Sequence, residues 1–243
     1  MGVSRSVLDK RRNPGALPYY ALGAACVAVF AAAGSLARAS TPVEITANGG
    51  ANSAWTAFVA ADAQIQTCTE VVDAYEVAGT KSQRRRYQMY FRKPNLVRAE
   101  IIGGDGAGSV AVWRGGNTVR AHRGGFLAFL TLTLPENDPR VVDDRGDTVD
   151  APFFPSIIGL FQQIGDISEG PEETIDGVDT DPVSVTPPDP SKYGGATKIT
   201  LYLSQATHLP VARRSWEGER LVEDVHFSDQ RVNVDVPVSK FAL

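Results

Sequence analysis

The feature that most constrains the fold of this chain is a series of short segments in which apolar and polar residues alternate. In one such segment Tyr87, Met89 and Phe91 share one face, and Arg84, Arg86 and Gln88 share the other. Alternation of this kind is typical of a strand with one buried face, and turns rich in glycine separate neighbouring segments. The pattern predicts an antiparallel meander, with strands at 71–79, 84–91, 96–101, 109–113, 118–123, 174–185, 199–203, 211–216, 221–227 and 232–236.

Residues 53–65 have the longer period of an amphipathic helix. Trp55, Phe58 and Val59 fall on one helical face. Asn52 or Ser53 can cap the first turn of this helix through its side-chain oxygen. This segment is therefore predicted to pack one face against the sheet.

Two strongly apolar segments interrupt the middle of the chain, at 126–134 and 153–164. Both are predicted to be helical, since Pro155 suits the first turn of a helix and the runs exceed what a strand needs. A sheet that buries one face needs a cover, and these segments supply one. The expected fold class is mainly β, within the α+β class, with helices on one face of an antiparallel sheet.

Composition narrows the class of protein further. Apolar residues make up 43% of the 243 positions and charged residues 21%, which excludes a disordered chain, a collagen-like fibre and a coiled coil. The net charge of −4 argues against nucleic acid as a partner, because phosphate binding needs a basic face. Two cysteines are too few for a disulfide scaffold or a cysteine-based zinc finger.

The first forty residues have the pattern of a secretory signal peptide. Basic residues precede a stretch without charge from Asn13 to Ala37, and Ala37-Arg38-Ala39 places small residues where a signal peptidase cleaves. We therefore expect a signal peptide at 1–39, a binding domain at 40–243 and export to the periplasm. The alternative is an uncleaved N-terminal helix that anchors the protein to the inner membrane, since the apolar stretch is about long enough to span a bilayer.

Cleavage after Ala39 would change the charge and the thiol content of the chain. The net charge would become −8, and Cys68 would be the one remaining cysteine. It is then either a buried small apolar residue or a reactive thiol. No histidine lies near it in the sequence, which favours burial.

Three stretches carry a more specific pattern. Residues 89–100 read MYFRKPNLVRAE, residues 108–116 read GSVAVWRGG, and residues 207–233 run from THLPV through a WEG turn to FSDQRVN. In this order they resemble the LolA-like outer-membrane lipoprotein-sorting family of exported bacterial proteins, whose relatives include LolB and the RseB-type stress sensors. The resemblance covers roughly residues 50–243. It implies a curved antiparallel sheet that forms an unclosed barrel, helices across its concave face, and an apolar space between them that accepts acyl chains.

The resemblance also implies a lipid-binding cavity between the sheet and its cover. Sorting members of the family latch their lid with an arginine, for which Arg84, Arg86 and Arg98 are candidates here. The alternative for the apolar residues is an ordinary packed core. The side chains expected to line the cavity are Met89, Phe91, Val97, Ile101 and Trp113 from the sheet, and Phe126, Phe129, Leu130, Phe153, Ile157, Ile158 and Phe161 from the cover.

No motif indicates catalysis, a cofactor or a metal site. The chain contains no G-x-S-x-G nucleophile elbow, and Gly103–Gly108 lacks the Lys-Ser/Thr of a phosphate loop. The acidic residues at 143–150 lack the spacing of a known calcium loop. The three histidines fall on separate predicted elements. We expect a monomer that is not an enzyme and that uses no cofactor, no metal and no nucleic-acid partner.

Two functional hypotheses follow. The first is a periplasmic carrier that binds lipid or lipoprotein acyl chains and takes part in outer-membrane lipoprotein sorting, with a membrane protein as donor or acceptor. The second is an RseB-type sensor that binds lipoprotein and a membrane partner. An enzyme acting through Cys68 or the acidic loop would need a polar cleft where the pattern predicts an apolar one.

Overall fold

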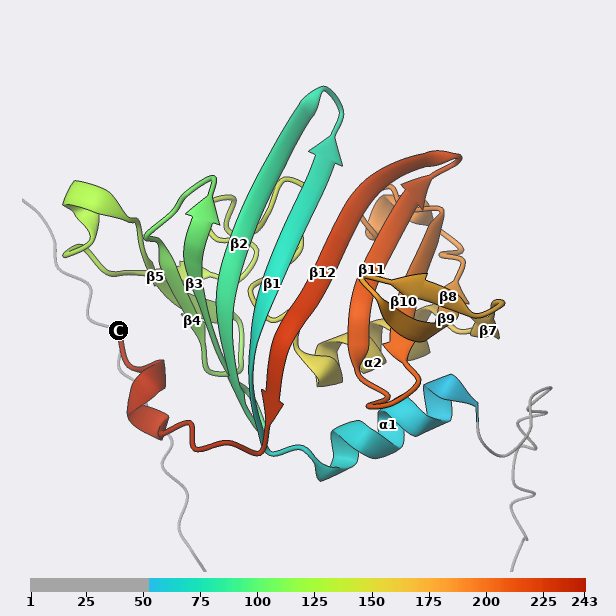
Figure 1. Ribbon diagram of the computed structural model, residues 1–243. Helices are drawn as coiled ribbons and strands as arrows, with labels where there is room; N and C mark the ends of the chain where they lie inside the picture. Colours follow the sequence, from blue (N-terminus) through green and yellow to red (C-terminus); the bar gives the residue numbers. More distant parts are fainter. Residues whose placement is uncertain (1–52) are drawn as a thin grey trace, which may run out of the picture. The chain divides into compact units, whose positions relative to one another are not determined.

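One antiparallel sheet organises the part of the chain that the computed structural model describes, residues 53–243 (Figure 1). Every pairing within it is antiparallel, so the meander predicted from the alternating segments is confirmed. Its twelve strands within these residues are β1 Thr67–Ala78, β2 Lys81–Arg92, β3 Leu96–Gly104, β4 Val110–Trp113, β5 Thr118–His122, β6 Leu132–Pro135, β7 Ser168–Glu169, β8 Glu173–Ile175, β9 Val178–Val185, β10 Lys198–Ser204, β11 Pro210–Glu217 and β12 Arg220–Val232.

The first and last strands along the chain, β1 and β12, pair with each other in the interior of the sheet. The order is β6-β5-β4-β3-β2-β1-β12-β11-β10-β9-β7, with β8 also paired to β9. The sheet is not closed into a barrel, so β6 lies at one edge and β7 at the other. The chain therefore builds one half of the sheet before residue 136 and the other half after residue 167, and the segment between them crosses one face.

Two α-helices lie against this sheet, α1 at Ala54–Gln64 and α2 at Phe154–Ile164. The side-chain oxygen of Ser53 caps α1 by accepting a hydrogen bond from the backbone N–H of Thr56 at 3.2 Å. Pro155 lies in the first turn of α2, where its missing N–H leaves no bond unmade. The helices predicted at 53–65 and 153–164 are confirmed. In Figure 1 α2 lies behind β11.

Aromatic side chains form the core between the helices and the sheet. The rings of Trp55 and Phe161 stack with their centroids 5.3 Å apart, and so do those of Phe91 and Phe153. Burying each ring contributes about 1.5–3 kcal/mol, and a favourable ring pair adds about 0.5–1.5 kcal/mol. Cys68 belongs to the same core, and burial raises the pKa of its thiol far above the usual range, so the prediction of a buried cysteine is confirmed.

The last eleven residues pack on the opposite face of β3 and β4. A short 3₁₀ helix, η3 at Val238–Phe241, buries Phe241 against Val112 and Val236. Arg92 of β2 and Arg114, which directly follows β4, hold this segment by its carbonyl groups. Arg114 donates to Phe241 O at 2.7 and 3.0 Å, and Arg92 donates to Val236 O at 3.0 Å. One face of this half of the sheet is thus covered by the C-terminus, and the other remains for the site.

Three sequence predictions about secondary structure are wrong. The single strand predicted at 174–185 is divided by a turn at Asp176 and Gly177, which have φ values of 51° and 80°, into β8 and β9, and these two strands pair with each other. Residues 126–134 do not form a helix: a 3₁₀ turn, η1 at Gly125–Leu127, is followed by β6. Leucine and threonine alternate from Leu130 to Leu134, and this period of two lets the segment pair with β5.

The strand predicted at 232–236 is also absent, because β12 ends at Val232. Asn233 has a φ of 55°, a left-handed conformation that turns the chain out of the sheet. Its side chain accepts from the N–H of Gln66 at 2.8 Å and donates to the carbonyl of Gln64 at 3.1 Å. These bonds to the end of α1 replace the strand.

The described residues, 53–243, belong to one compact unit. The predicted signal peptide at 1–39, and with it the alternative of an N-terminal anchor, lies outside them. Within residues 53–243, neither α-helix reaches the length and apolar character needed to cross a membrane.

Candidate functional site

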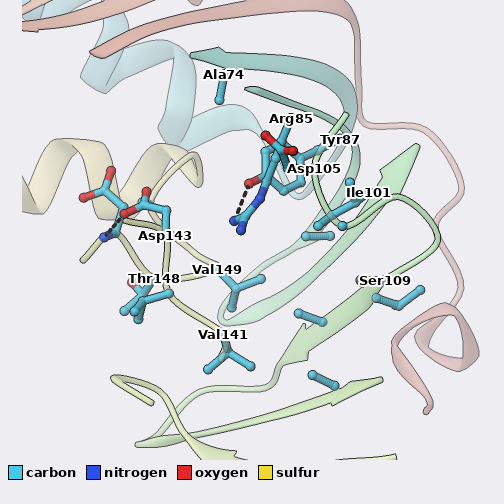
Figure 2. Close-up of a pocket in the computed structure, with 18 of the residues that line it drawn as sticks. Ala74, Arg85, Tyr87, Ile101, Asp105, Ser109, Val141, Asp143, Thr148 and Val149 are labelled. Carbon is cyan, nitrogen blue, oxygen red and sulfur yellow. Dashed lines mark hydrogen bonds between the residues drawn. The ribbon is translucent and has the colours of Figure 1, made fainter. Parts of the chain in front are cut away.

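A cavity of about 690 Å³ lies between the sheet and residues 136–153, which we call the cover segment. The helices fill the space beside β9 and β10, whereas the cover segment contains no helix or strand. Strands β1–β5 line one side of the cavity, and the cover segment lines the other with Val141 and Val149 (Figure 2). The volume lies within the range of about 300–1,000 Å³ that is usual for small-molecule sites.

A row of small side chains accounts for the cavity. Ala99 pairs with Ala111, and Ala111 pairs with Ala121, across β3, β4 and β5. Cross-strand partners share a face, and all three line the cavity. Met89 continues the row on β2. Because an alanine extends only one carbon from the backbone, the row leaves space where larger side chains would meet the cover segment.

The twelve residues predicted to line a lipid cavity do not come together in one place. The structure divides them into three sets. Met89, Ile101 and Leu130 line the cavity. Phe126 and Phe129 project from η1 and the turn after it, 89% and 77% exposed. The others pack in or against the core between helices and sheet, namely Phe91, Val97, Trp113, Phe153, Ile157, Ile158 and Phe161.

Two arginines tie the cover segment to the sheet. Arg145, which belongs to the segment, donates to Val77 O at 2.8 Å and to Glu217 Oε1 at 3.0 Å. Arg213 of β11 donates to the carboxylate of Asp147 in the segment. Both guanidinium groups are buried. Displacing the segment from the cavity would therefore break these ion pairs.

The three arginines considered as latches from the sequence bind elsewhere. Arg86 pairs with Asp73 at 3.8 Å, and Arg98 pairs with Glu100 at 2.6 Å. The guanidinium of Arg84 lies over the ring of Tyr75, 5.3 Å from its centroid. None of these contacts reaches the cover segment, so the contacts to it come from Arg145 and Arg213 instead.

One end of the cavity is polar. Glu76 and Gln83 face each other across β1 and β2, and Arg85 donates to the hydroxyl of Tyr87 at 3.4 Å. Figure 2 shows the guanidinium of Arg85 directed toward the cover segment, where Asp143 lies. These side chains line the same cavity as the alanine row, so the site is amphipathic.

A buried ion pair completes the polar end. Arg213 is 6% exposed, and besides Asp147 it binds Glu223 of β12, which also accepts from the hydroxyl of Ser215. Burial lowers the pKa of Arg213, but the charges of Glu223 and Asp147 outweigh this effect and raise it. Arg213 therefore stays ionised while two carboxylates share its charge.

Two further carboxyl groups at this end hold their protons unusually well. Burial raises the pKa of Glu76 to about 9, and the negative charges of Asp143, Glu223 and Asp147 add to the shift. Burial and the neighbouring charge of Asp147 raise the pKa of Asp143 to about 7. Desolvation and repulsion between carboxylates both favour the neutral acid. Near neutral pH, the pair of carboxyl groups on Glu76 and Asp143 is therefore partly protonated.

The acidic residues noted in the sequence do not assemble a metal site. Within residues 53–243 no group of three or more His, Cys, Asp and Glu side chains is placed to hold a metal ion. Asp143 instead accepts hydrogen bonds from the backbone N–H groups of Arg145 and Asp147, both at 2.8 Å. Asp150 accepts from the hydroxyl groups of Thr148 and Ser156. These carboxylates shape the cover segment and join it to α2.

Sequence reasoning missed the polar end, although one signal was present. In the hairpin around Glu217 and Gly218, counting back from the turn places Arg213 and Glu223 on one face. Opposite charges on the buried face of a hairpin indicate a pair. Their third partner, Asp147, lies 66 residues away from Arg213, and no local pattern connects them.

The fold has relatives among solved structures, whereas no protein-family model and no curated protein matches the sequence. An uncharacterized conserved protein from Thermus thermophilus has a similar structure, with a TM-score of 0.51 at 10% identity over 78% of this chain and 93% of that one. The fold is an unclosed antiparallel barrel with helices on one face, the architecture expected from the sequence.

Two other solved structures resemble the chain more loosely. A LolA superfamily protein from Nitrosomonas europaea has a TM-score of 0.38 at 15% identity, over 79% of this chain and 99% of that one. The Mycobacterium tuberculosis lipoprotein LppX has a TM-score of 0.42 at 12% identity, over 76% and 96%. At these identities the likeness concerns the fold alone.

Proposed function

We propose that this protein is an exported carrier that takes acyl chains of a lipid or lipoprotein into the cavity under the cover segment. The observation that carries the proposal is the cavity itself, about 690 Å³ bounded by an alanine row and by valines of the cover. At about 30 Å³ for each water-sized group, it has room for roughly twenty carbon-sized groups, or one long acyl chain.

The energetics suit reversible capture. Each buried methylene contributes about 0.8 kcal/mol, so a dozen contribute about 10 kcal/mol. This is comparable to the cost of association, about 4–15 kcal/mol, so a longer chain is held and a shorter one is released. The ties at Arg145 and Arg213 must be broken and remade as the segment moves. In this proposal the protein performs no covalent chemistry, acts in the periplasm, and delivers its cargo through opening of the cover.

The experiment is to express the full chain in bacteria, purify it without detergent, and record native mass spectra before and after lipid extraction. The proposal expects co-purified acyl species whose mass is lost on extraction. A matched control is Ala111→Phe, which fills the cavity from the centre of the alanine row and should purify without lipid. Wild-type protein that carries no lipid and also fails to bind added fatty acids would refute the proposal.

A second measurement separates the carrier from the sensor. A carrier meets its donor and acceptor transiently, whereas a sensor holds its membrane partner in a stable complex. Affinity purification from solubilised membranes should therefore recover the tagged protein without a stoichiometric partner. A partner retained at one copy per protein would favour the RseB-type role.

A further inference from the structure

Four polar atoms at the polar end of the cavity have no hydrogen-bond partner among the described residues. They are Oε2 of Glu76, Oε1 of Gln83, Nε of Arg85 and Nε of Arg213. All four side chains line the cavity. Leaving a buried polar atom unpaired costs about 1–3 kcal/mol, so their clustering here indicates a surface built for a polar group of a ligand.

The side chains that carry these atoms are held in place. Glu76 is 4% exposed and Arg213 is 6% exposed. Strand pairing places Gln83 opposite Glu76, and the ion pair with Glu223 orients Arg213. A ligand would find these groups already positioned, which reduces the entropy lost on binding.

The charge of this end favours one class of headgroup. The largest charge effects on Glu76 come from the carboxyl groups of Asp143, Glu223 and Asp147 and from the guanidinium of Arg85. Asp105, His122, Arg123 and Arg140 also line the cavity but are not among these charges. Arg213 is already shared by two of the carboxylates. Arg145 on the same segment points to Val77 and Glu217 instead. An anionic headgroup would lie beside unpaired carboxyls, whereas a cation would complete their charge.

We infer that the cavity selects amphiphiles whose polar end is a cationic, hydrogen-bond-donating headgroup, of which a primary ammonium is the simplest. This inference rests on the proposed function and specifies its ligand class. The ammonium donates to Glu76 Oε2 and Gln83 Oε1, the two unpartnered acceptors. The two arginine Nε–H groups donate to a neutral oxygen of the ligand, such as an ester or hydroxyl oxygen. The charges of both guanidinium groups are already opposed by nearby carboxyl groups.

Binding of the cation is coupled to proton release. Without it, Glu76 and Asp143 hold protons above their ordinary range, because burial and neighbouring carboxylates raise the pKa of each. An ammonium placed between them favours the carboxylate form, so one proton leaves as the cation enters. Affinity for a cationic amphiphile should therefore rise with pH between about 6 and 9. The affinity for an uncharged amphiphile should not rise over the same range of pH.

The test compares amphiphiles with the same chain and different headgroups, each below its micelle concentration, by calorimetric titration of the delipidated full chain. The probes are dodecylammonium, dodecanoate and dodecanol. We expect dodecylammonium to bind roughly ten- to a hundredfold more tightly than the other two, the range that one charge-assisted hydrogen bond supplies. Titration in two buffers of different ionisation enthalpy should show release of about one proton at about pH 8.

Variants locate the selectivity. The double variant Glu76→Gln with Asp143→Asn should bind all three probes within about threefold of one another, because the remaining charges of Asp147 and Glu223 are balanced by those of Arg85 and Arg213. Asp73→Asn, an exposed carboxyl on the other face of β1, removes a charge without touching the cavity and should keep the wild-type ratio. The wild-type proton count needs no variant, so the test stands even if the double variant fails to fold.

The outcomes separate the two proposals. Equal affinity for the three probes, tighter binding of dodecanoate, or no proton release would overturn the headgroup inference and leave the carrier function intact. Failure of all three probes to bind would overturn the carrier function and the inference together.

Discussion

Filling the cavity from the alanine row should weaken acyl binding without weakening the fold. Ala111 lies at the centre of this row, paired with Ala99 on one side and Ala121 on the other. In Ala111→Phe the added ring brings six carbons, roughly a quarter of the twenty or so that the cavity accommodates. Displacing about five methylenes of a bound chain removes about 4 kcal/mol at 0.8 kcal/mol each. Because a chain can bend around the ring, we expect the affinity to fall at least about tenfold.

The matched control places the same substitution in packed core. Ala212 is fully buried against Ile175, Tyr202 and Val211, and overpacking such a site costs about 1–3 kcal/mol or more. Urea denaturation should show a clear loss of stability for Ala212→Phe and a change within about 1 kcal/mol for Ala111→Phe. Fatty-acid titration then measures the loss of binding. If Ala111→Phe is as destabilised as the control, or binds fatty acid like the wild type, the reasoning is wrong.

Three further predictions concern stability. Arg213→Met leaves the buried carboxylate of Glu223 unpaired, so chemical denaturation should show a free energy of unfolding lower by about 3–5 kcal/mol. A decrease below about 1 kcal/mol would contradict the ion-pair account. Burial raises the pKa of Glu70 to about 8, so its folded form binds more protons than the unfolded one, and stability falls as pH rises from about 4.5 to 8. Glu70→Gln should therefore gain stability over wild type at about pH 8, by about 2–4 kcal/mol, and little at about pH 4; a gain independent of pH would refute this. Phe126→Ser removes an 89% exposed ring and should change the free energy of unfolding by no more than about 0.5 kcal/mol, so a larger loss would show that the ring packs.

Local patterns predicted most of the strands and both helices, because their causes are local. A period of two or of 3.6 is written in neighbouring residues, as at Met89 or Phe58, and the fold needs only one buried face for each element. The predictions failed where distant residues decide the outcome. Asn233 leaves the sheet because its amide binds the end of α1, about 170 residues earlier.

The cavity was harder to predict than the fold. Met89 and Phe91 alternate on one face of β2, yet Met89 lines the cavity while Phe91 stacks on Phe153. Whether an apolar side chain packs in the core or lines a cavity depends on which segment lies opposite it. The local sequence pattern is the same around Met89 and Phe91, so it cannot distinguish the two outcomes. The informative signal was the set of small residues that pair across neighbouring strands, such as Ala99 and its partners. They show where the inner face of the sheet leaves room for a cavity.

The polar end illustrates the same limit for charge. Glu76 lies on the inward face of β1 beyond Val72 and Ala74, and a single acid at the end of an apolar face is indistinguishable from a solvated strand end. Only the sheet order, which places β12 beside β1, brings Glu223 and Arg213 next to it. A cluster of charges on strands that are distant in the sequence but adjacent in the sheet can be recognised only once the order of the strands is known.

The most direct test of the central claim is to locate a bound acyl chain by photo-crosslinking. A fatty acid with a diazirine at its chain end is bound to the delipidated full chain and irradiated, and the labelled peptides are mapped by mass spectrometry. Our account predicts labels in β2–β5 and in the cover segment, on peptides that contain Met89, Ala111 or Val141. Labels confined to α1 or to the exposed pair Phe126 and Phe129, with none in the cavity, would contradict it.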